Sequence, residues 1–186
     1  MISTRRAILA ELDTAIRKRD PRLAQQLRPG QSHNAVVRRL RRVIGETEPL
    51  LDLYTWHDGT EPLRRSDGDT HVLSLLELSL IPGELCIFEE LEASFATFVG
   101  WSEIAEYHGR IKEAVGRYFP LLWDGSDTWL TLDLKPGQKG RIVYFELQND
   151  SPFRTAYPTF DDFLLDALRA NETGLRLRVF DEGLAD

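Results

Sequence analysis

The sequence predicts an α+β fold, in which helices pack around a twisted antiparallel sheet of about five or six strands, preceded by an added N-terminal helical segment. Three observations support this prediction. Residues 128–134 and 141–147 alternate between two kinds of side chain, as paired strands do. A helix with a clear start signal begins after Thr159. Residues 4–28 carry apolar side chains at the spacing of an amphipathic helix.

Length and composition are those of a soluble globular protein. A chain of 186 residues is long enough to bury a core as one domain, or as one domain with an appendage. No apolar run approaches the roughly 20 residues that span a bilayer, and the N-terminus lacks the features of a secretory signal. The single cysteine, Cys86, excludes an internal disulfide and is typical of a reducing compartment. We therefore expect a cytoplasmic protein with no membrane segment.

The charge is distributed unevenly along the chain. Residues 1–45 contain eleven Arg and Lys against three Asp and Glu, a charge of +8, and the remainder carries −15, which together give −7. The two parts either face different partners or neutralise one another within the fold. Within the basic part, the cluster of Arg38, Arg39, Arg41 and Arg42 could bind nucleic acid. No helix-turn-helix or aromatic platform accompanies it, so a solvated helix face is favoured over nucleic-acid binding.

The N-terminal part predicts two helical stretches. Pro21 removes a backbone donor and clashes one turn back, so we expect the helix over residues 4–28 to break near Asp20. Pro29-Gly30 then ends this stretch. A second helix is predicted over residues 33–45 and ends at Gly45. Its apolar face is formed by Val36, Val37, Leu40, Val43 and Ile44.

The middle of the chain is harder to interpret. Glu48-Pro49 opens a short helix that runs to Trp56, and His57-Asp58-Gly59 reads as a turn. The remaining predictions are a loop over residues 60–70, a strand over 71–76, a strand over 84–88, a helix over 89–98 and a helix over 102–116.

The clearest pattern lies between residues 128 and 168. In the first strand, Leu130, Leu132 and Leu134 share one face, and Trp129, Thr131 and Asp133 share the other. In the second strand, Val143, Phe145 and Leu147 alternate with Ile142, Tyr144 and Glu146. A Pro-Gly-x-x-Gly turn joins them into a hairpin. Its second face carries Trp129, Tyr144 and Ile142, and we expect this face to be only partly exposed.

The helix after this hairpin has both of its ends marked. Thr159 is the predicted N-cap, Asp161 and Asp162 lie near the positive end, and Gly174 stops the helix. Its inward residues are Phe160, Phe163, Leu164, Ala167 and Leu168. Beyond it, Leu175, Leu177 and Val179 alternate with Arg176 and Arg178, which predicts a short edge strand.

Several of these stretches together resemble the SUKH superfamily, which includes cell-wall assembly regulators and bacterial toxin-immunity proteins. The resemblance covers roughly residues 46–174, and therefore implies a SUKH-like α+β domain over 46–186 after a basic helical segment over 1–45. The residues that carry it are Leu53 to Gly59, Phe119-Pro120-Leu121 with Asp124-Gly125, Leu132-Asp133-Leu134, Gly140 to Val143, Thr159 to Leu164 and Gly174. The sequence departs from the family pattern at Tyr118 and at the turn over residues 125–128.

No catalytic, metal or cofactor motif is visible in the sequence. His33, His57, His71 and His108 are scattered without metal-site spacing, and Cys86 lies in an apolar run that favours a buried thiol. Neither a nucleophile elbow nor a phosphate-binding loop is present. Asp124, Asp127 and Asp133 could hold a cation or act as acid and base, but turn formation and strand-face charge explain them more simply. We therefore expect a protein that is not an enzyme and has no cofactor.

The resemblance implies a protein-binding role, foremost an immunity protein that neutralises a cognate polymorphic toxin. A regulatory scaffold related to the cell-wall assembly regulators is the alternative. An acidic surface with aromatic side chains could cover the basic active site of a nuclease toxin, because complementary charge speeds association and aromatic residues make strong contacts. On this hypothesis the partner-binding residues are Trp123, Asp124, Asp127, Trp129 and Asp133.

Overall fold

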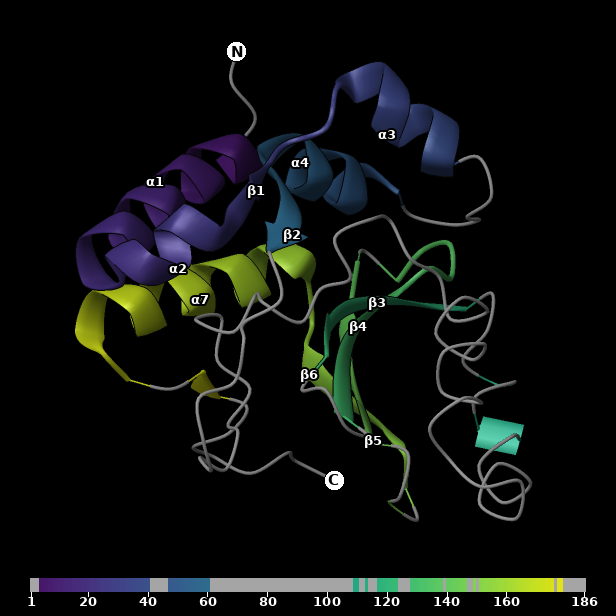
Figure 1. Cartoon of the computed structure of the whole chain (residues 1–186). Helices are drawn as coiled ribbons and strands as arrows, with labels where there is room; N and C mark the ends of the chain where they lie inside the picture. The colour runs from purple at the N-terminus through teal and green to yellow at the C-terminus, as the bar shows by residue number, and fades with distance from the viewer. Residues whose placement is uncertain are drawn as a thin grey trace, which may run out of the picture.

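The computed structural model describes residues 4–40, 47–60, 117–123, 128–138, 140–146 and 151–175, together with residues 109, 110, 113, 149, 177 and 178. The fold is α+β, as the sequence predicts (Figure 1). Its helices are α1 (Thr4–Arg19), α2 (Pro21–Gln26), α3 (His33–Leu40), α4 (Glu48–Trp56) and α7 (Phe160–Thr173). Its strands are β1 (Leu27–Pro29), β2 (His57–Thr60), β3 (Tyr118–Trp123), β4 (Thr128–Asp133), β5 (Ile142–Glu146) and β6 (Phe153–Tyr157).

The described strands form two antiparallel sheets. β1 pairs with β2, and the larger sheet has the order β3-β4-β5-β6. The described part of the larger sheet has four strands, whereas the sequence predicts five or six, and two of the predicted strands, over 71–76 and 84–88, lie outside the described residues. The short β1 and β2 pair with each other and not with the larger sheet. The predicted hairpin is confirmed, since β4 and β5 are antiparallel. The predicted grouping of Ile142 and Tyr144 with Trp129 is wrong: both lie opposite leucines of β4, whereas Trp129 lies opposite Phe145.

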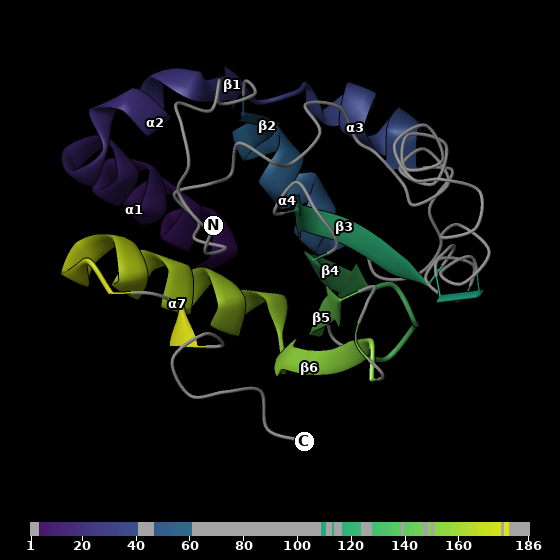
Figure 2. The same ribbon diagram turned by 60° about the horizontal axis from the view of Figure 1, so that its bottom comes forward.

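One face of the larger sheet is buried by helices. Leu130, Leu132 and Ile142 are fully buried on this face, and they belong to one apolar cluster with residues of α1, α4 and α7. Figures 1 and 2 both show α1 lying along α7, with α3 at the opposite end of the helical layer. The leucine face of β4 is therefore core, as its alternation predicts.

The N-terminal segment is helical, as predicted, but it is not separate from the rest of the domain. Ile8, Leu12 and Ile16 of α1 are buried in the same cluster as Phe160 and Ala167 of α7. Burial of this apolar face is the main force that holds such a helix in place. The predicted division between residues 1–45 and 46–186 therefore does not divide the core.

The predicted helix break at Asp20 is confirmed. The Asp20 amide donates to the carbonyl oxygen of Ile16 at 2.8 Å and so closes α1, while the Asp20 carboxylate accepts from the Arg22 amide at 3.0 Å. Pro21 occupies the first position of α2, where its missing donor costs nothing.

The turn predicted at His57-Asp58-Gly59 is wrong, because these residues form strand β2. β2 runs antiparallel to β1, with Leu27 opposite Thr60 and Pro29 opposite His57. Gly59 nevertheless has a left-handed φ of +72°, a conformation that glycine adopts readily. Pairing with β1 supplies the backbone partners that an isolated turn would lack, and this pairing joins segments about thirty residues apart.

Helix α7 begins and ends as predicted. The Thr159 hydroxyl oxygen accepts from the Asp162 amide at 3.1 Å, and Gly174 has a left-handed φ of +81° at the C-terminal end. The edge strand predicted after it is wrong in the described residues, since Leu175 is 58% exposed and unpaired in any sheet, whereas Leu177 is buried. Val179 lies outside the described residues.

Two further predictions are tested in part. α3 is confirmed over His33–Leu40 and buries Val36 and Leu40, but Val37, predicted to face inward, is 38% exposed. Residues 109, 110 and 113 of the predicted helix over 102–116 are helical. Residues 41–46, the loop over 61–70, the strands over 71–76 and 84–88 and the helix over 89–98 lie outside the described residues.

Candidate functional site

The structure does not support the predicted Trp-Asp contact surface. Trp129 is 3% exposed and Asp133 is completely buried, so neither side chain can contact a partner directly. The backbone of Trp123 pairs with Trp129 in the sheet. The Trp123 side chain and residues Asp124 and Asp127 lie outside what the structure describes. The two residues of the predicted surface that can be placed, Trp129 and Asp133, are therefore interior residues. Their burial contradicts the prediction that they contact a partner.

Trp129 is buried because the second face of the larger sheet carries its own aromatic layer. Trp129 stacks on Phe145 at 5.2 Å, Phe145 on Phe153 at 4.8 Å, and Phe153 on Tyr118 at 4.9 Å, measured between ring centroids. In a flat sheet, Tyr118 of β3 and Phe153 of β6 would lie at least about 14 Å apart, because three strand spacings separate them sideways and they are also offset along the strands. The sheet must therefore curl strongly around this face. Stacked rings inside the curl contribute core packing and not a surface.

Asp133 has a structural role at the mouth of the β4–β5 hairpin. Its carboxylate pairs with the Arg141 guanidinium at 2.5 Å and accepts from the Lys135 amide at 3.0 Å, while Arg117 lies at 3.7 Å. These partners compensate its burial. Burial also raises the pKa of the neighbouring Tyr118, and the Arg117 charge acts in the opposite direction. Among the described residues, no group of three or more His, Cys, Asp and Glu side chains could hold a metal ion.

His57 joins three elements with its two ring nitrogens. Nδ1 lies 2.7 Å from the carbonyl oxygen of Arg28, and Nε2 lies 3.0 Å from a carboxylate oxygen of Asp13. Both ring nitrogens therefore lie within hydrogen-bond distance of an oxygen atom. Burial acts to raise the pKa of Asp13, but hydrogen bonds from Arg17 and His57 outweigh it and lower that pKa. Both nitrogens are therefore used to hold β2 against α1 and β1, a structural role.

Two basic residues of α1 pair with acidic residues of the later chain. Arg5 contacts Asp161 at 2.6 Å and Asp52 at 3.2 Å, and Arg6 contacts Asp52 at 2.9 Å. These pairs support the interpretation that the basic and acidic parts neutralise one another within the fold. A cavity of about 480 Å³ adjoins them; it is lined by Arg6, Leu9, Ala10, Gln31, His33, Asp52, Thr55 and Trp56.

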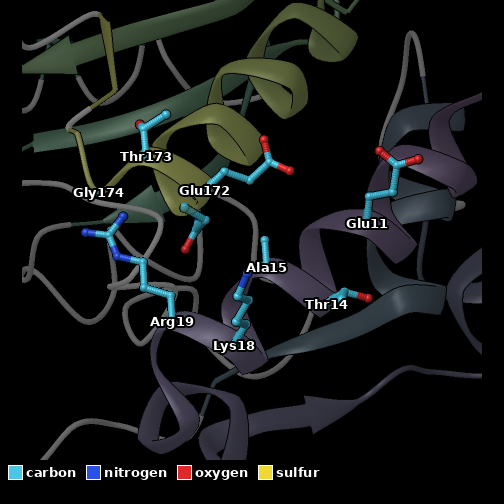
Figure 3. A pocket seen from close by; sticks show the side chains of 9 residues that line it. Glu11, Thr14, Ala15, Lys18, Arg19, Glu172, Thr173 and Gly174 are labelled. Carbon is cyan, nitrogen blue, oxygen red and sulfur yellow. The ribbon is translucent and has the colours of Figure 1, made fainter.

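A larger, open groove of about 740 Å³ lies between α1 and the C-terminal end of α7, and we call it the α1–α7 groove. Figure 3 shows side chains of α1 on one side and of the end of α7 on the other. It is lined by Glu11, Thr14, Ala15, Lys18, Arg19, Asn171, Glu172, Thr173 and Gly174. Arg19 of α1 donates to the carbonyl oxygen of Ala170, which positions a positive charge at the negative end of α7.

Glu11, Glu172 and Lys18 remain available in this groove. All three are exposed, and within the described part of the chain none of them forms an ion pair or hydrogen bond. Sequence reasoning missed the groove because its two sides lie about 150 residues apart. The sequence carries one signal for this groove. The last turn of α1 holds three basic residues, Arg17, Lys18 and Arg19, whereas the last turn of α7 holds none.

The comparisons with known proteins do not assign the chain to a family. No protein-family model matches the chain, and no curated protein matches it either. The resemblance to the SUKH superfamily therefore stays a prediction. Among the described residues, none of the helices combines the length and apolar character needed to cross a membrane.

Proposed function

We propose that this chain is a cytoplasmic, non-enzymatic protein-binding domain, foremost an immunity protein that neutralises a cognate polymorphic toxin. The observation that carries the proposal is the α1–α7 groove together with the exposed leucines beside it. The partner-binding surface is thus moved from the Trp-Asp residues predicted from the sequence to α1 and α7.

The outer face of α7 combines apolar and charged side chains. Leu165 is 51% exposed and Leu175 is 58% exposed, and these are the two most exposed large apolar side chains in the described residues. Leu165 and Glu172 are seven residues apart on one helix, so they share a face. Leu175 follows Gly174, which lines the groove. Apolar contacts within a polar, charged rim are typical of transient protein interfaces.

The charges around the groove favour a specific partner over a general one. Glu11 and Glu172 face the groove with Lys18, so a partner must supply charges of matching sign at matching places (Figure 3). Such complementarity contributes mainly to association rate and specificity. The alternative function, a regulatory scaffold related to cell-wall assembly regulators, would use the same surface for a different protein. Arg5 and Arg6 are engaged with carboxylates. Of the arginine cluster considered for nucleic-acid binding, Arg38 is exposed on α3, and Arg41 and Arg42 lie outside the described residues.

The test is co-expression with a toxin encoded beside this chain. If the chain is an immunity protein, it restores growth of cells that express the toxin, and the two proteins bind when purified. Leu165→Asp should weaken binding at least about ten-fold, because it places an unpaired charge in the apolar part of the interface. Val37→Asp is the matched control, since Val37 is an exposed apolar residue of α3, away from α7 (Figure 1).

The outcomes separate the two functions. Growth rescue that Leu165→Asp abolishes and Val37→Asp preserves supports immunity through α7. Equal effects of both variants would contradict the assigned surface. Absence of any neighbouring toxin gene, with binding to a cell-wall enzyme or its regulator, would favour the scaffold function.

A further inference from the structure

The exposed face of α1 carries two opposite charges at equal distances from its middle. Glu11 and Lys18 both line the α1–α7 groove, and neither forms an ion pair or hydrogen bond within the described part of the chain. Seven residues separate them, so they share one face of the helix and lie about 10 Å apart along its axis. Thr14 and Ala15 lie between them, as Figure 3 shows. This face is therefore negative on the N-terminal side of its middle and positive on the C-terminal side.

Such a face is complementary to a second copy of itself. When two identical helices lie antiparallel about a two-fold axis, each residue faces the one that lies equally far on the other side of the axis. An axis at the level of Thr14 and Ala15 places Glu11 of each copy opposite Lys18 of the other, so the same ion pair forms twice. Any other register of two antiparallel copies of α1 leaves both charges unmatched. Thr14 and Ala15 are small, and helix axes approach each other more closely where the side chains at the contact are small.

The charges of the groove as a whole do not oppose this pairing. The groove lining holds two carboxylates, Glu11 and Glu172, and two cations, Lys18 and Arg19. The groove therefore has no net charge that would repel an identical groove. A partner of one sign gains no net attraction from such a balance, whereas a surface with the same two signs in reverse order does.

We propose that two copies of this chain associate through the groove face of α1, antiparallel about a two-fold axis, with Glu11 of each copy paired with Lys18 of the other. The contact face is about as long as α1, roughly 24 Å for 16 residues, and about 18 Å wide, two helix spacings. It buries roughly 900 Å² in total, the size of a transient interface, so we expect a dissociation constant of about 10–100 μM. The dimer does not depend on the proposed function, although a toxin bound in the same groove would separate the two copies.

The test is sedimentation equilibrium of the purified full chain over about 1–500 μM, a range that brackets the expected dissociation constant. We expect a monomer–dimer equilibrium that weakens at high salt, because exposed charge pairs are screened. Lys18→Glu should weaken the dimer at least about ten-fold, since it replaces two attractive pairs with two repulsive ones. Arg38→Glu is the matched control and should leave the dimer unchanged. It makes the same change of charge on α3, where Arg38 is exposed and has no ion pair within the described residues (Figure 1).

A charge swap tests the register directly. Glu11→Lys alone should also weaken the dimer. The double variant with Glu11→Lys and Lys18→Glu should restore it to within about three-fold of the unchanged chain, because both pairs form again with their signs reversed. A mixture of the two single variants should form heterodimers, since each supplies the sign that the other lacks. Both positions are exposed, so we expect these variants to keep the fold, which circular dichroism checks.

Each result supports or overturns the proposal. A chain that stays monomeric at every concentration would overturn it. Equal weakening by Lys18→Glu and Arg38→Glu, or a double variant that stays monomeric, would refute pairing through these charges. Dimerisation that the swap restores supports the proposal, whether or not the chain neutralises a toxin. Growth rescue by a chain that is monomeric in solution would leave the proposed function standing and refute the dimer alone.

Discussion

Leu12→Ala tests whether α1 is part of the domain core. Leu12 is fully buried in the cluster that joins α1 to α7. Leu→Ala substitutions at such sites lower the free energy of unfolding by about 3–5 kcal/mol, through lost burial and the cavity left behind. For a chain of this length, a loss of about 3 kcal/mol corresponds to a fall of about 6–12 °C in Tm. An appended segment would instead unfold locally and leave the Tm of the body unchanged.

The assay is thermal and urea unfolding, followed by circular dichroism and tryptophan fluorescence. Leu165→Ala is the matched control, a leucine in a helix of the same core that is 51% exposed, for which we expect a loss of about 1 kcal/mol or less. Both variants should unfold in one transition. Two separate transitions, or equal losses for Leu12→Ala and Leu165→Ala, would refute the conclusion that α1 belongs to the core.

Three further predictions concern local structure. Thr159→Ala should lower the free energy of unfolding by about 1 kcal/mol in urea titrations, since the hydroxyl caps α7. Gly30→Ala should lower the free energy of unfolding by about 3 kcal/mol, because the added Cβ would lie 2.0 Å from the carbonyl oxygen of Thr55. Gly137→Ala is the control: its Cβ meets open space, so it should lose only the roughly 1–2 kcal/mol that a left-handed φ costs. Burial raises the pKa of Tyr118 above its usual value of 10.0. The neutral phenol therefore contributes fully to the free energy of unfolding below pH 10.0, and this contribution is lost as the pH rises through the folded pKa. Tyr118→Phe should flatten that alkaline loss of stability in unfolding titrations at a series of pH values.

Elements whose partners lie nearby in sequence could be predicted from the sequence. The β4–β5 hairpin needs only its alternation and its turn, and α7 needs only the cap at Thr159 and the stop at Gly174. The break at Asp20 follows from one proline. In each case the signal and the structure it specifies lie within about twenty residues, so local physical rules are sufficient.

The environment of Trp129 could not be predicted in the same way. Alternation states that Trp129 and Asp133 share a face of β4, but it does not state what covers that face. Coverage depends on the curl that brings Tyr118 of β3 over Phe153 of β6. Likewise, the pairing of Leu27 with Thr60 and the contact of Arg19 with Ala170 join distant segments and leave no periodic signal.

The pairing of opposite charges within the fold changes what the net charge says about partners. Arg5 and Arg6 of α1 are engaged with carboxylates of the later chain, and Arg19 lies at the negative end of α7, so part of the positive charge of the N-terminal part is balanced internally. On the described surface, a partner therefore encounters unpaired charges such as Glu172 and Lys18 beside these internal pairs. Exposed charges are screened beyond about 8 Å at physiological salt. Recognition at the α1–α7 groove should consequently depend on the exact placement of single charges, and reversing Glu172 alone should alter binding more than a distant change that shifts the net charge equally.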